Sequence, residues 1–188
     1  MIIVFAKAPV PGQAKTRLIP RLGAWGAARL QARLTLAALR TARAARCGPV
    51  ELHVTARHAS FRCGVRLQRG ADLGERMQRA FASALRRHRP VILIGTDCPA
   101  LRPADLRRAL RWLHGGCDVV LAPAEDGGYA LIGMKRIVPR IFDRIPWGEA
   151  GVYAATAERL AGRRWRALRT VWDVDRPEDL DRLGSVRF

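Results

Sequence analysis

The stretch Val91-Ile92-Leu93-Ile94-Gly95-Thr96-Asp97-Cys98-Pro99 decides the fold class of this chain. Its first four residues are all apolar, which predicts a buried strand over Val91–Gly95. Pro103 then begins a helical pattern that runs to Leu113, because the first turn of a helix tolerates a missing amide. A buried strand that passes through a polar loop into a helix is the repeating unit of an α/β protein.

Apolar runs alternate with helical patterns along the whole chain, without an internal repeat or a low-complexity linker. The predicted strands are Ile2–Ala6, Val50–Thr55, Val65–Gln68, Val91–Gly95, Val119–Ala122, Tyr129–Gly133 and Arg169–Val171. The predicted helices are Ala24–Arg46, Leu73–Arg87, Pro103–Leu113, Gly151–Leu160 and a short one near Pro177–Leu183. Strands separated by helices favour a mostly parallel sheet with helices on both faces. We therefore expect a single α/β domain of three layers over residues 1–188.

The composition is that of an ordinary globular protein. Of the 188 residues, 49% are hydrophobic and 27% are charged, which argues against a disordered chain. No apolar run approaches the roughly 18 residues of a membrane span. The first apolar run, Ile2–Ala6, is shorter than the core of about 7–15 residues that a signal peptide needs. We therefore expect a cytoplasmic protein.

The cysteines match neither a zinc pattern nor a Cys-x-x-Cys pair. They are Cys47, Cys63, Cys98 and Cys117. In a reducing compartment all four are expected to be free thiols. Cys98 lies beside Asp97 with no histidine near it in sequence, so we expect it to shape a site by packing and not to act as a nucleophile.

The formal net charge of +18 comes almost entirely from arginine, because Lys7, Lys15 and Lys135 are the only lysines. The arginines are spread over every predicted helix, with no basic tail and no aromatic signature of RNA binding. This distribution is typical of solvated helix faces, so specific nucleic-acid binding is not expected. Weak, salt-sensitive association with nucleic acid is expected.

In an open α/β sheet, ligands bind beyond the carboxyl ends of the strands. The first such loop, residues 8–17, contains two prolines and Gly12, which permits a positive φ or a close backbone approach. Two of the three lysines, Lys7 and Lys15, lie at this loop together with Arg17. An ammonium and a guanidinium there could hold phosphate, so Lys7, Gly12, Lys15 and Arg17 are candidate phosphate-binding residues. The alternative is an ordinary connection with solvated cations.

Asp97 directly follows the buried strand 91–95. A carboxylate at that place can bind Mg²⁺ or Mn²⁺ and leave other coordination positions to phosphate oxygens and water. The alternative is that Asp97 caps the next helix. Pro103 and Asp105 already provide helix-start signals, so the metal role is favoured.

Two further loops are acidic. The stretch Glu125-Asp126-Gly127-Gly128-Tyr129 is either a hairpin turn, which Asp-Gly favours, or a flexible acceptor-side loop whose amides meet a substrate. In the second case Asp126 either binds a sugar hydroxyl or acts as a base. Asp173 and Asp175 alternate along an extended segment, so both are expected to point the same way and to bind a divalent cation. The alternative is that Asp175 or Arg176 begins the helix at Pro177.

Together these stretches resemble a family of small bacterial transferases with the GT-A, or nucleotide-diphospho-sugar transferase, fold. Its members are named as radical-SAM/selenodomain-associated transferases and as glycosyltransferases proposed for arsenosugar biosynthesis. The stretches that carry the resemblance are Phe5–Pro9, Lys15–Leu18, Asp72–Met77, Gly95–Pro99, Glu125–Tyr129, Asp173–Asp175 and Pro177–Leu180.

The resemblance implies a mixed sheet of about seven strands with a nucleotide bound over its first half. It makes Asp97 the main metal ligand and places the nucleotide pocket at Asp72–Met77, with Gly74 and Arg76. Pro99 stands where glycosyltransferases carry the second acid of Asp-x-Asp, so we expect Asp173 or Asp175 to supply the missing ligand.

The first loop is also similar to one in 2-phospholactate guanylyltransferase and its relatives, where a Lys-Ser/Thr-Arg-Leu stretch faces the triphosphate. Two functions therefore stay open. One is metal-dependent transfer of a sugar from a nucleotide sugar to a small acceptor, with Asp126 and Lys15 as catalytic residues. The other is nucleotidyl transfer from an NTP, with Lys15 as the cation on the phosphate under attack. A third class, a basic nucleic-acid-binding module, leaves the acidic loops unexplained.

Overall fold

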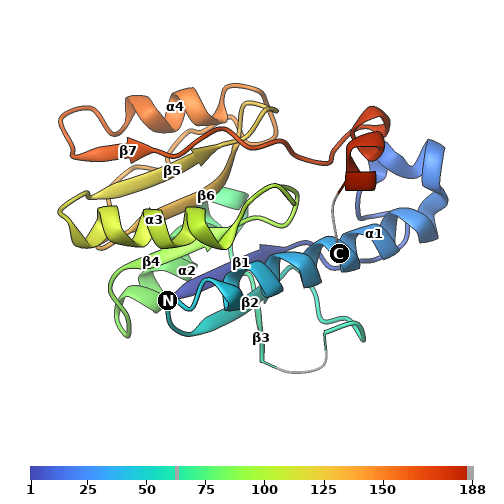
Figure 1. Ribbon diagram of the computed structural model, residues 1–188, viewed down its shortest axis with the longest axis horizontal. Helices are drawn as coiled ribbons and strands as arrows, with labels where there is room; N and C mark the ends of the chain where they lie inside the picture. The colour runs from blue at the N-terminus through green and yellow to red at the C-terminus, as the bar shows by residue number, and fades with distance from the viewer. Residues whose placement is uncertain (62–63, 186–188) are drawn as a thin grey trace.

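The computed structural model describes residues 1–61 and 64–185, which form a mixed seven-stranded sheet with helices on both faces (Figure 1). The strands are β1 (Ile2–Ala6), β2 (Val50–Val54), β3 (Val65–Leu67), β4 (Val91–Ile94), β5 (Val119–Pro123), β6 (Tyr129–Met134) and β7 (Trp165–Ala167). The helices are α1 (Ile19–Ala44), α2 (Leu73–Leu85), α3 (Pro103–His114) and α4 (Val152–Glu158), with the 3₁₀ helices η1 (Thr16–Leu18) and η2 (Pro177–Ser185). The predicted α/β fold class is confirmed.

The strand order is β3-β2-β1-β4-β6-β5-β7. Within the described sheet β6 runs antiparallel to both of its neighbours, β4 and β5, and the other neighbouring strands are parallel. Because β5 is antiparallel to β6, it has the same direction as β4 and β1. The loops that follow these three strands therefore meet at one edge of the sheet, which we call the carboxyl edge.

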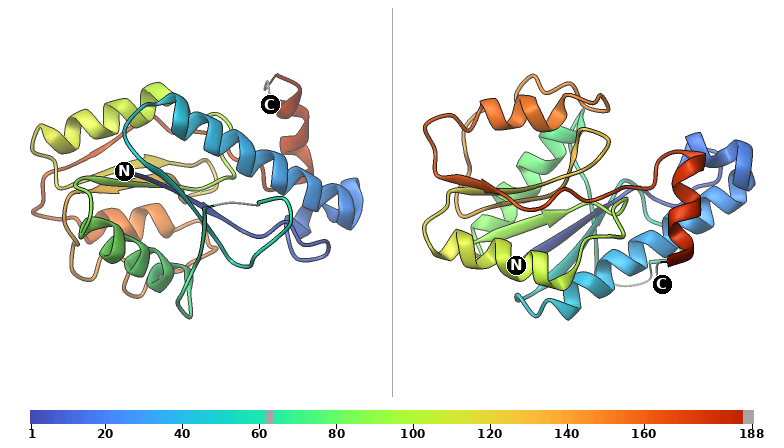
Figure 2. Two further views of the ribbon diagram at one scale, coloured as in Figure 1. Left: turned by 90° about the horizontal axis from the view of Figure 1, so that it is seen from below. Right: turned by 45° about the horizontal axis from the view of Figure 1, so that its top comes forward.

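Two hydrophobic cores lie on opposite faces of the sheet (Figure 2). Ile3 and Phe5 of β1 pack with α2 and with the chain around α4. Ile2 and Val4 pack with α1 and α3 on the other face. Both faces of the central strands are therefore buried, which explains why these strands are continuously apolar and not alternating.

The element α1 spans Ile19–Ala44 but is broken at Gly23, whose φ of 67° is outside the helical region. The helix predicted from Ala24 therefore begins directly after this break, and a short helical segment precedes it. One element differs from the sequence prediction. The strand predicted at Arg169–Val171 is wrong: β7 is Trp165–Ala167, in register with Val119–Leu121. Val171 forms only an isolated bridge with Ala124.

η2 packs against the beginning of α1, as Figure 1 shows at the right of the sheet. The contact buries Leu18, Leu34 and Val174 together with partly buried side chains of η2, and Arg21 forms an ion pair with Asp181 at 2.9 Å. This contact holds residues 172–176 beside the loop that follows β1.

The described part of the chain contains no helix with both the length and the apolar character that a membrane crossing requires. Cys47, Cys98 and Cys117 are free thiols, as expected; Cys63 lies outside the described residues.

α2 begins with a side-chain cap at Asp72. Asp72 accepts a hydrogen bond from the Glu75 amide at 2.8 Å, and Glu75 accepts one from the Ala71 amide at 2.7 Å. Gly74 lies in the first turn, where an added Cβ would stand 2.9 Å from the Trp147 ring and 3.0 Å from the Phe142 carbonyl oxygen. The beginning of α2 is therefore packed closely against Trp147, and a side chain at position 74 does not fit.

We expect Gly74→Ala to destabilise the fold by about 1–3 kcal/mol, the usual range for overpacking a close contact. Gly184→Ala is the matched control, because no heavy atom outside its own neighbourhood lies within 4 Å of a Cβ there, and it should change stability by less than about 0.5 kcal/mol. Urea denaturation of the two variants and the wild type measures both changes. Equal stabilities would contradict the packing at Trp147.

Candidate active site

A buried ion pair joins three distant segments at the carboxyl edge. Lys15 is 4% exposed in its side chain, and its Nζ lies 2.8 Å from Asp97 Oδ1. The same ammonium donates to the Val174 carbonyl oxygen at 2.5 Å. Two oxygen partners are what a buried ammonium needs, because leaving it unpaired would cost several kcal/mol. The Asp97 side chain is 53% exposed, so the part of its carboxylate that does not contact Lys15 faces solvent.

Lys15 has a left-handed backbone conformation, with φ at 50°. This conformation ends the loop after β1 and leads directly into η1. Val174 in turn donates its amide to the Asp97 carbonyl oxygen at 2.8 Å. The contact uses a compact ammonium with two acceptors, which accounts for a lysine in a chain otherwise rich in arginine.

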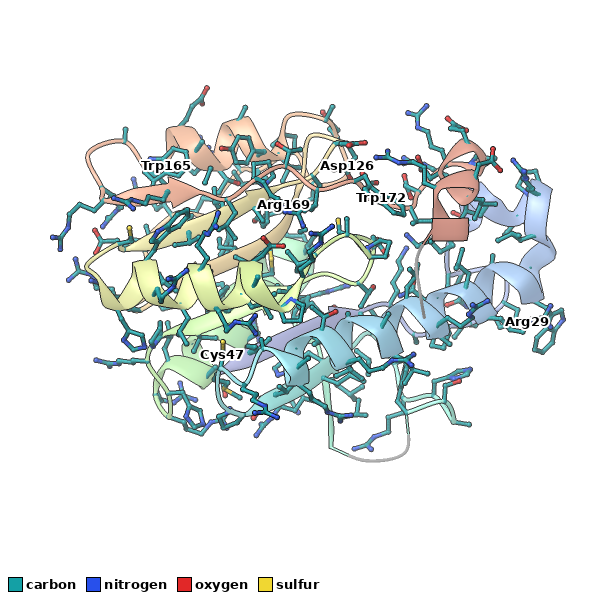
Figure 3. All side chains as sticks on the ribbon, viewed as in Figure 1. Arg29, Cys47, Asp126, Trp165, Arg169 and Trp172 are labelled. Atoms are coloured by element: carbon teal, nitrogen blue, oxygen red, sulfur yellow. The ribbon has the colours of Figure 1, made fainter. Side chains whose placement is uncertain are left out.

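Asp126 and Asp173 form the second acidic part of the site. Asp173 is buried, and burial together with the neighbouring charges of Asp126, Asp179 and Asp175 raises its pKa to about 6. The Asp126 amide donates to it and offsets part of this rise. Figure 3 shows Asp126 and Trp172, which precedes Asp173, close together at this edge of the sheet.

The charges of three carboxylates at this edge act on the Cys98 thiol. Burial raises its pKa well above the usual value, and the charges of Asp97, Asp173 and Asp126 raise it further. The thiol therefore stays protonated at neutral pH, which agrees with a packing role and not with a nucleophile. All three carboxylates lie close enough to one sulfur atom to act on it.

The loop at Glu125–Gly128 is a fixed hairpin turn, which corrects the expectation of a flexible loop with free amides. The Glu125 amide donates to Val171, the Gly127 amide to Ala124, and the Gly128 amide to the Asp126 carboxylate. Gly127 has a φ of 85°, and an added Cβ would stand 1.9 Å from the Ala150 carbonyl oxygen. With the amides already used inside the protein, the Asp126 carboxylate is the group that this turn can offer to a substrate.

The structure changes the roles predicted for Tyr129 and Glu125 on the acceptor side. The Tyr129 hydroxyl is buried and has no hydrogen-bond partner among the described residues, and the side chain packs against the core beside α2. The tyrosine side chain therefore does not face an acceptor. Glu125 forms a two-point ion pair with Arg182 at 2.6 and 3.2 Å, and Arg182 lies over the Trp172 ring at 4.7 Å, so the charge of Glu125 is already compensated.

Asp173 and Asp175 have different partners, so their two carboxylates do not converge on one metal site. Asp173 is buried beside Asp126, whereas Asp175 forms an ion pair with Arg17. The cap of η2 is Asp179, which accepts from the amides of Asp175 at 2.9 Å and Arg176 at 2.7 Å. A predicted metal ligand and a predicted phosphate-binding residue thus neutralise each other at the rim of the site.

The other predicted nucleotide-binding residues lie around this edge. Lys7 is exposed at the end of β1, and Gly12 has a φ of 78° in the exposed turn after it. Gly74 is buried under Trp147. Arg76 donates its Nε to the Gly70 carbonyl oxygen at 3.0 Å, which ties the loop before α2 to the helix.

One buried polar network was not anticipated. Gln31 of α1 donates its side-chain amide to the Thr96 hydroxyl at 3.1 Å, and Thr35 donates to the Gln31 carbonyl oxygen at 2.8 Å. Thr96 Oγ1 lies 3.4 Å from Asp97 Oδ1. The network fixes the Asp97 loop to α1. The available sequence signal was two polar residues four positions apart on the apolar face of a helix.

The fold and this edge define a class: transferases with the nucleotide-diphospho-sugar transferase type of α/β sheet. A family model described as an uncharacterised protein conserved in bacteria, DUF2064, matches residues 27–149, and the chain belongs to this family. A Desulfovibrio desulfuricans structure, described as a proposed nucleotide-diphospho-sugar transferase, superposes with a TM-score of 0.83 at 32% identity, over 98% of this chain and 87% of that one.

A phosphoenolpyruvate guanylyltransferase of Thermomonospora curvata is 37% identical over 101 residues, which are 54% of this chain and 43% of that relative. The matched part is thus less than half of that curated relative. A Mycobacterium tuberculosis protein in complex with manganese shares the fold, with a TM-score of 0.63 at 21% identity over 98% of both chains. These relatives agree with the prediction that the chain is an enzyme of the transferase class.

The raised pKa of Asp173 makes the stability of the fold depend on pH. Between its ordinary value of 3.8 and about 6 the folded state binds more protons than the unfolded state, so stability falls as pH rises through this window. We expect Asp173→Asn to raise Tm at pH 7.5 by a few degrees, corresponding to roughly 1–2 kcal/mol.

The gain from Asp173→Asn should disappear near pH 4, where the wild-type carboxyl is protonated as well. Thermal melts at the two pH values test this, with Asp143→Asn as the control because Asp143 is exposed. A variant equally stabilised at both pH values, or destabilised at pH 7.5, would refute the electrostatic origin.

Proposed function

We propose that this chain is a metal-dependent glycosyltransferase that moves a sugar from a nucleoside-diphosphate sugar to a small, uncharged acceptor. The observation that carries the proposal is the group of charges at the carboxyl edge, where Lys15 and Asp97 meet beside Asp126 and Asp173. A cation and several carboxylates at this place suit a donor with a diphosphate and an acceptor with a hydroxyl group.

The carboxylate oxygens of Asp97 and Asp173 suit a divalent metal. The pKa of Asp173 is raised first by burial and then by neighbouring acids, and a bound cation would relieve the repulsion from those acids. Asp97, which keeps half of its side chain in solvent, and Asp173 would hold Mg²⁺ or Mn²⁺, ions that commonly take only one or two carboxylates and complete their coordination with phosphate and water. Bound there, the metal would neutralise charge on the departing diphosphate.

Lys15, Arg17 and Asp126 would then have separate roles in the reaction. Lys15 supplies a fixed positive charge beside the diphosphate, and Arg17 is a second cation that can exchange Asp175 for phosphate. The acceptor oxygen forms a bond with the anomeric carbon of the sugar as the bond from that carbon to the diphosphate oxygen breaks. The exposed Asp126 carboxylate takes the proton of the acceptor hydroxyl, and the nucleoside diphosphate leaves.

The charge of the acceptor side favours sugar transfer over nucleotidyl transfer. With Asp173 holding the metal, the exposed Asp126 carboxylate is the charge on the acceptor side, and it would repel a phosphorylated acceptor and tolerate a neutral one. A hydroxyl acceptor also needs a base, whereas a phosphate acceptor is already ionised at neutral pH. The resemblance to glycosyltransferases proposed for arsenosugar biosynthesis agrees with a small acceptor, and we expect the reaction to take place in the cytoplasm.

Nucleotidyl transfer is the second candidate because the curated relative is named as a guanylyltransferase. In that reaction Lys15 would lie beside the α-phosphate of an NTP, and pyrophosphate would leave. The same donor-side residues serve both reactions, so the acceptor side is the part that distinguishes them.

The experiment is a transfer assay with UDP- and GDP-sugars, small hydroxylated acceptors and Mn²⁺ or Mg²⁺. We expect metal-dependent release of nucleoside diphosphate that requires both the sugar donor and an acceptor. If no sugar donor reacts while an NTP and a phosphorylated acid release pyrophosphate, the second candidate replaces the first. Absence of both activities would contradict both.

Two neighbouring aspartates provide matched variants for this assay. Asp97→Asn should lower kcat by roughly 100-fold or more, the usual cost of losing a group that stabilises transition-state charge. Asp175→Asn, which removes the partner of Arg17 at the rim, should change it by less than about fivefold because no transition-state contact is lost. Equal losses in the two variants would remove Asp97 from its special role.

A further inference from the structure

A cavity lies at the end of the sheet opposite the carboxyl edge. Its volume is about 360 Å³, and it is lined by Arg89, Pro90, Leu113, His114, Lys135 and Arg136. These residues come directly before β4, from the end of α3, and directly after β6. They meet because β6 is antiparallel to β4, with Met134 opposite Val91.

The lining carries four basic side chains from three separate segments. Arg136 is the one with an acidic partner, Asp118, at 3.2 Å. Arg89 donates its Nε to the Leu85 carbonyl oxygen at 3.2 Å, which anchors the side chain and leaves the terminal nitrogens of the guanidinium available. The side chains of Lys135 and His114 form no hydrogen bond or ion pair within residues 1–61 and 64–185.

The end of α3 explains only part of this charge. The carbonyl groups at a helix C-terminus favour a nearby cation, and His114 is placed to supply it. Arg89 and Lys135 belong to other segments and are not needed for that purpose. Lys135 is half-buried and is one of only three lysines in the chain. Another of the three, Lys15, is already used as a compact cation in the candidate active site.

We propose that this cavity binds a small phosphate-bearing anion at a site separate from the active site. Lys135 would act as a point charge and Arg89 as a fork for phosphate oxygens, while Pro90 and Leu113 form a buried apolar wall. The volume lies near the lower end of the range of about 300–1,000 Å³ for small-molecule sites. A concave site of this size suits a small anion better than a nucleic-acid backbone, which needs an extended basic surface. The inference does not depend on the proposed function.

The probe is inorganic pyrophosphate, titrated by isothermal calorimetry in EDTA and about 150 mM salt, an ionic strength that screens diffuse surface charge. All measurements use the Lys15→Met background, which removes the buried cation of the carboxyl edge, while Arg17 at the rim is paired with Asp175. We expect one saturable site, weakened at least tenfold by Lys135→Gln and by Arg89→Gln. Arg40→Gln, which removes the same charge from the exposed surface of α1, should change the affinity by less than twofold.

Thermal melts establish whether each variant is folded. If Lys135→Gln is unfolded, Arg89→Gln provides the second test of the site. Absence of saturable binding up to millimolar pyrophosphate would overturn the proposal. Equal weakening by Arg40→Gln would overturn it as well, because the binding would then reflect net charge alone.

Discussion

The candidate site depends on how the Lys15 ammonium is paired in the interior. Its two partners, Asp97 and the Val174 carbonyl, come from segments about 80 and 160 positions further along the chain, and burying an ammonium without both would cost several kcal/mol. The contact therefore fixes the loops after β1 and β4 and the segment before η2 relative to one another. The packing of η2 against α1 supports the same arrangement from the outside.

Around this pair the acidic groups divide into compensated and uncompensated ones. Asp97, Asp175 and Glu125 form ion pairs with Lys15, Arg17 and Arg182, which leaves Asp126 and Asp173 as the uncompensated negative charge of the site among the described residues. That charge is maintained in a chain with a net charge of +18. A buried carboxyl such as Asp173 lowers stability at neutral pH, which is typical of residues retained for function and not for folding.

The fold was predictable from continuous apolar runs such as Val91–Ile94, because such runs are typical of strands in a parallel sheet that is covered on both faces. The sequence also indicated Lys15 and Asp97, since both follow such strands. It could not show that they touch, because that contact depends on the path of residues 172–175. Nor could it show that the amides of the Glu125–Gly128 turn are already used, or that Gln31 reaches Thr96, since these depend on tertiary packing. The strand at Trp165–Ala167 was missed because it follows Arg163 and Arg164 directly and contains Arg166, so the stretch shows no apolar run.

The central claim is that a divalent cation joins the Asp97 carboxylate to the diphosphate of a bound nucleotide. The most direct measurement is anomalous scattering from crystals grown with Mn²⁺ and a nucleoside diphosphate. The account predicts a manganese peak within coordination distance of Asp97 and of diphosphate oxygens. A bound nucleotide with its manganese elsewhere, or with Asp97 paired to Lys15 alone and no manganese beside it, would contradict the account.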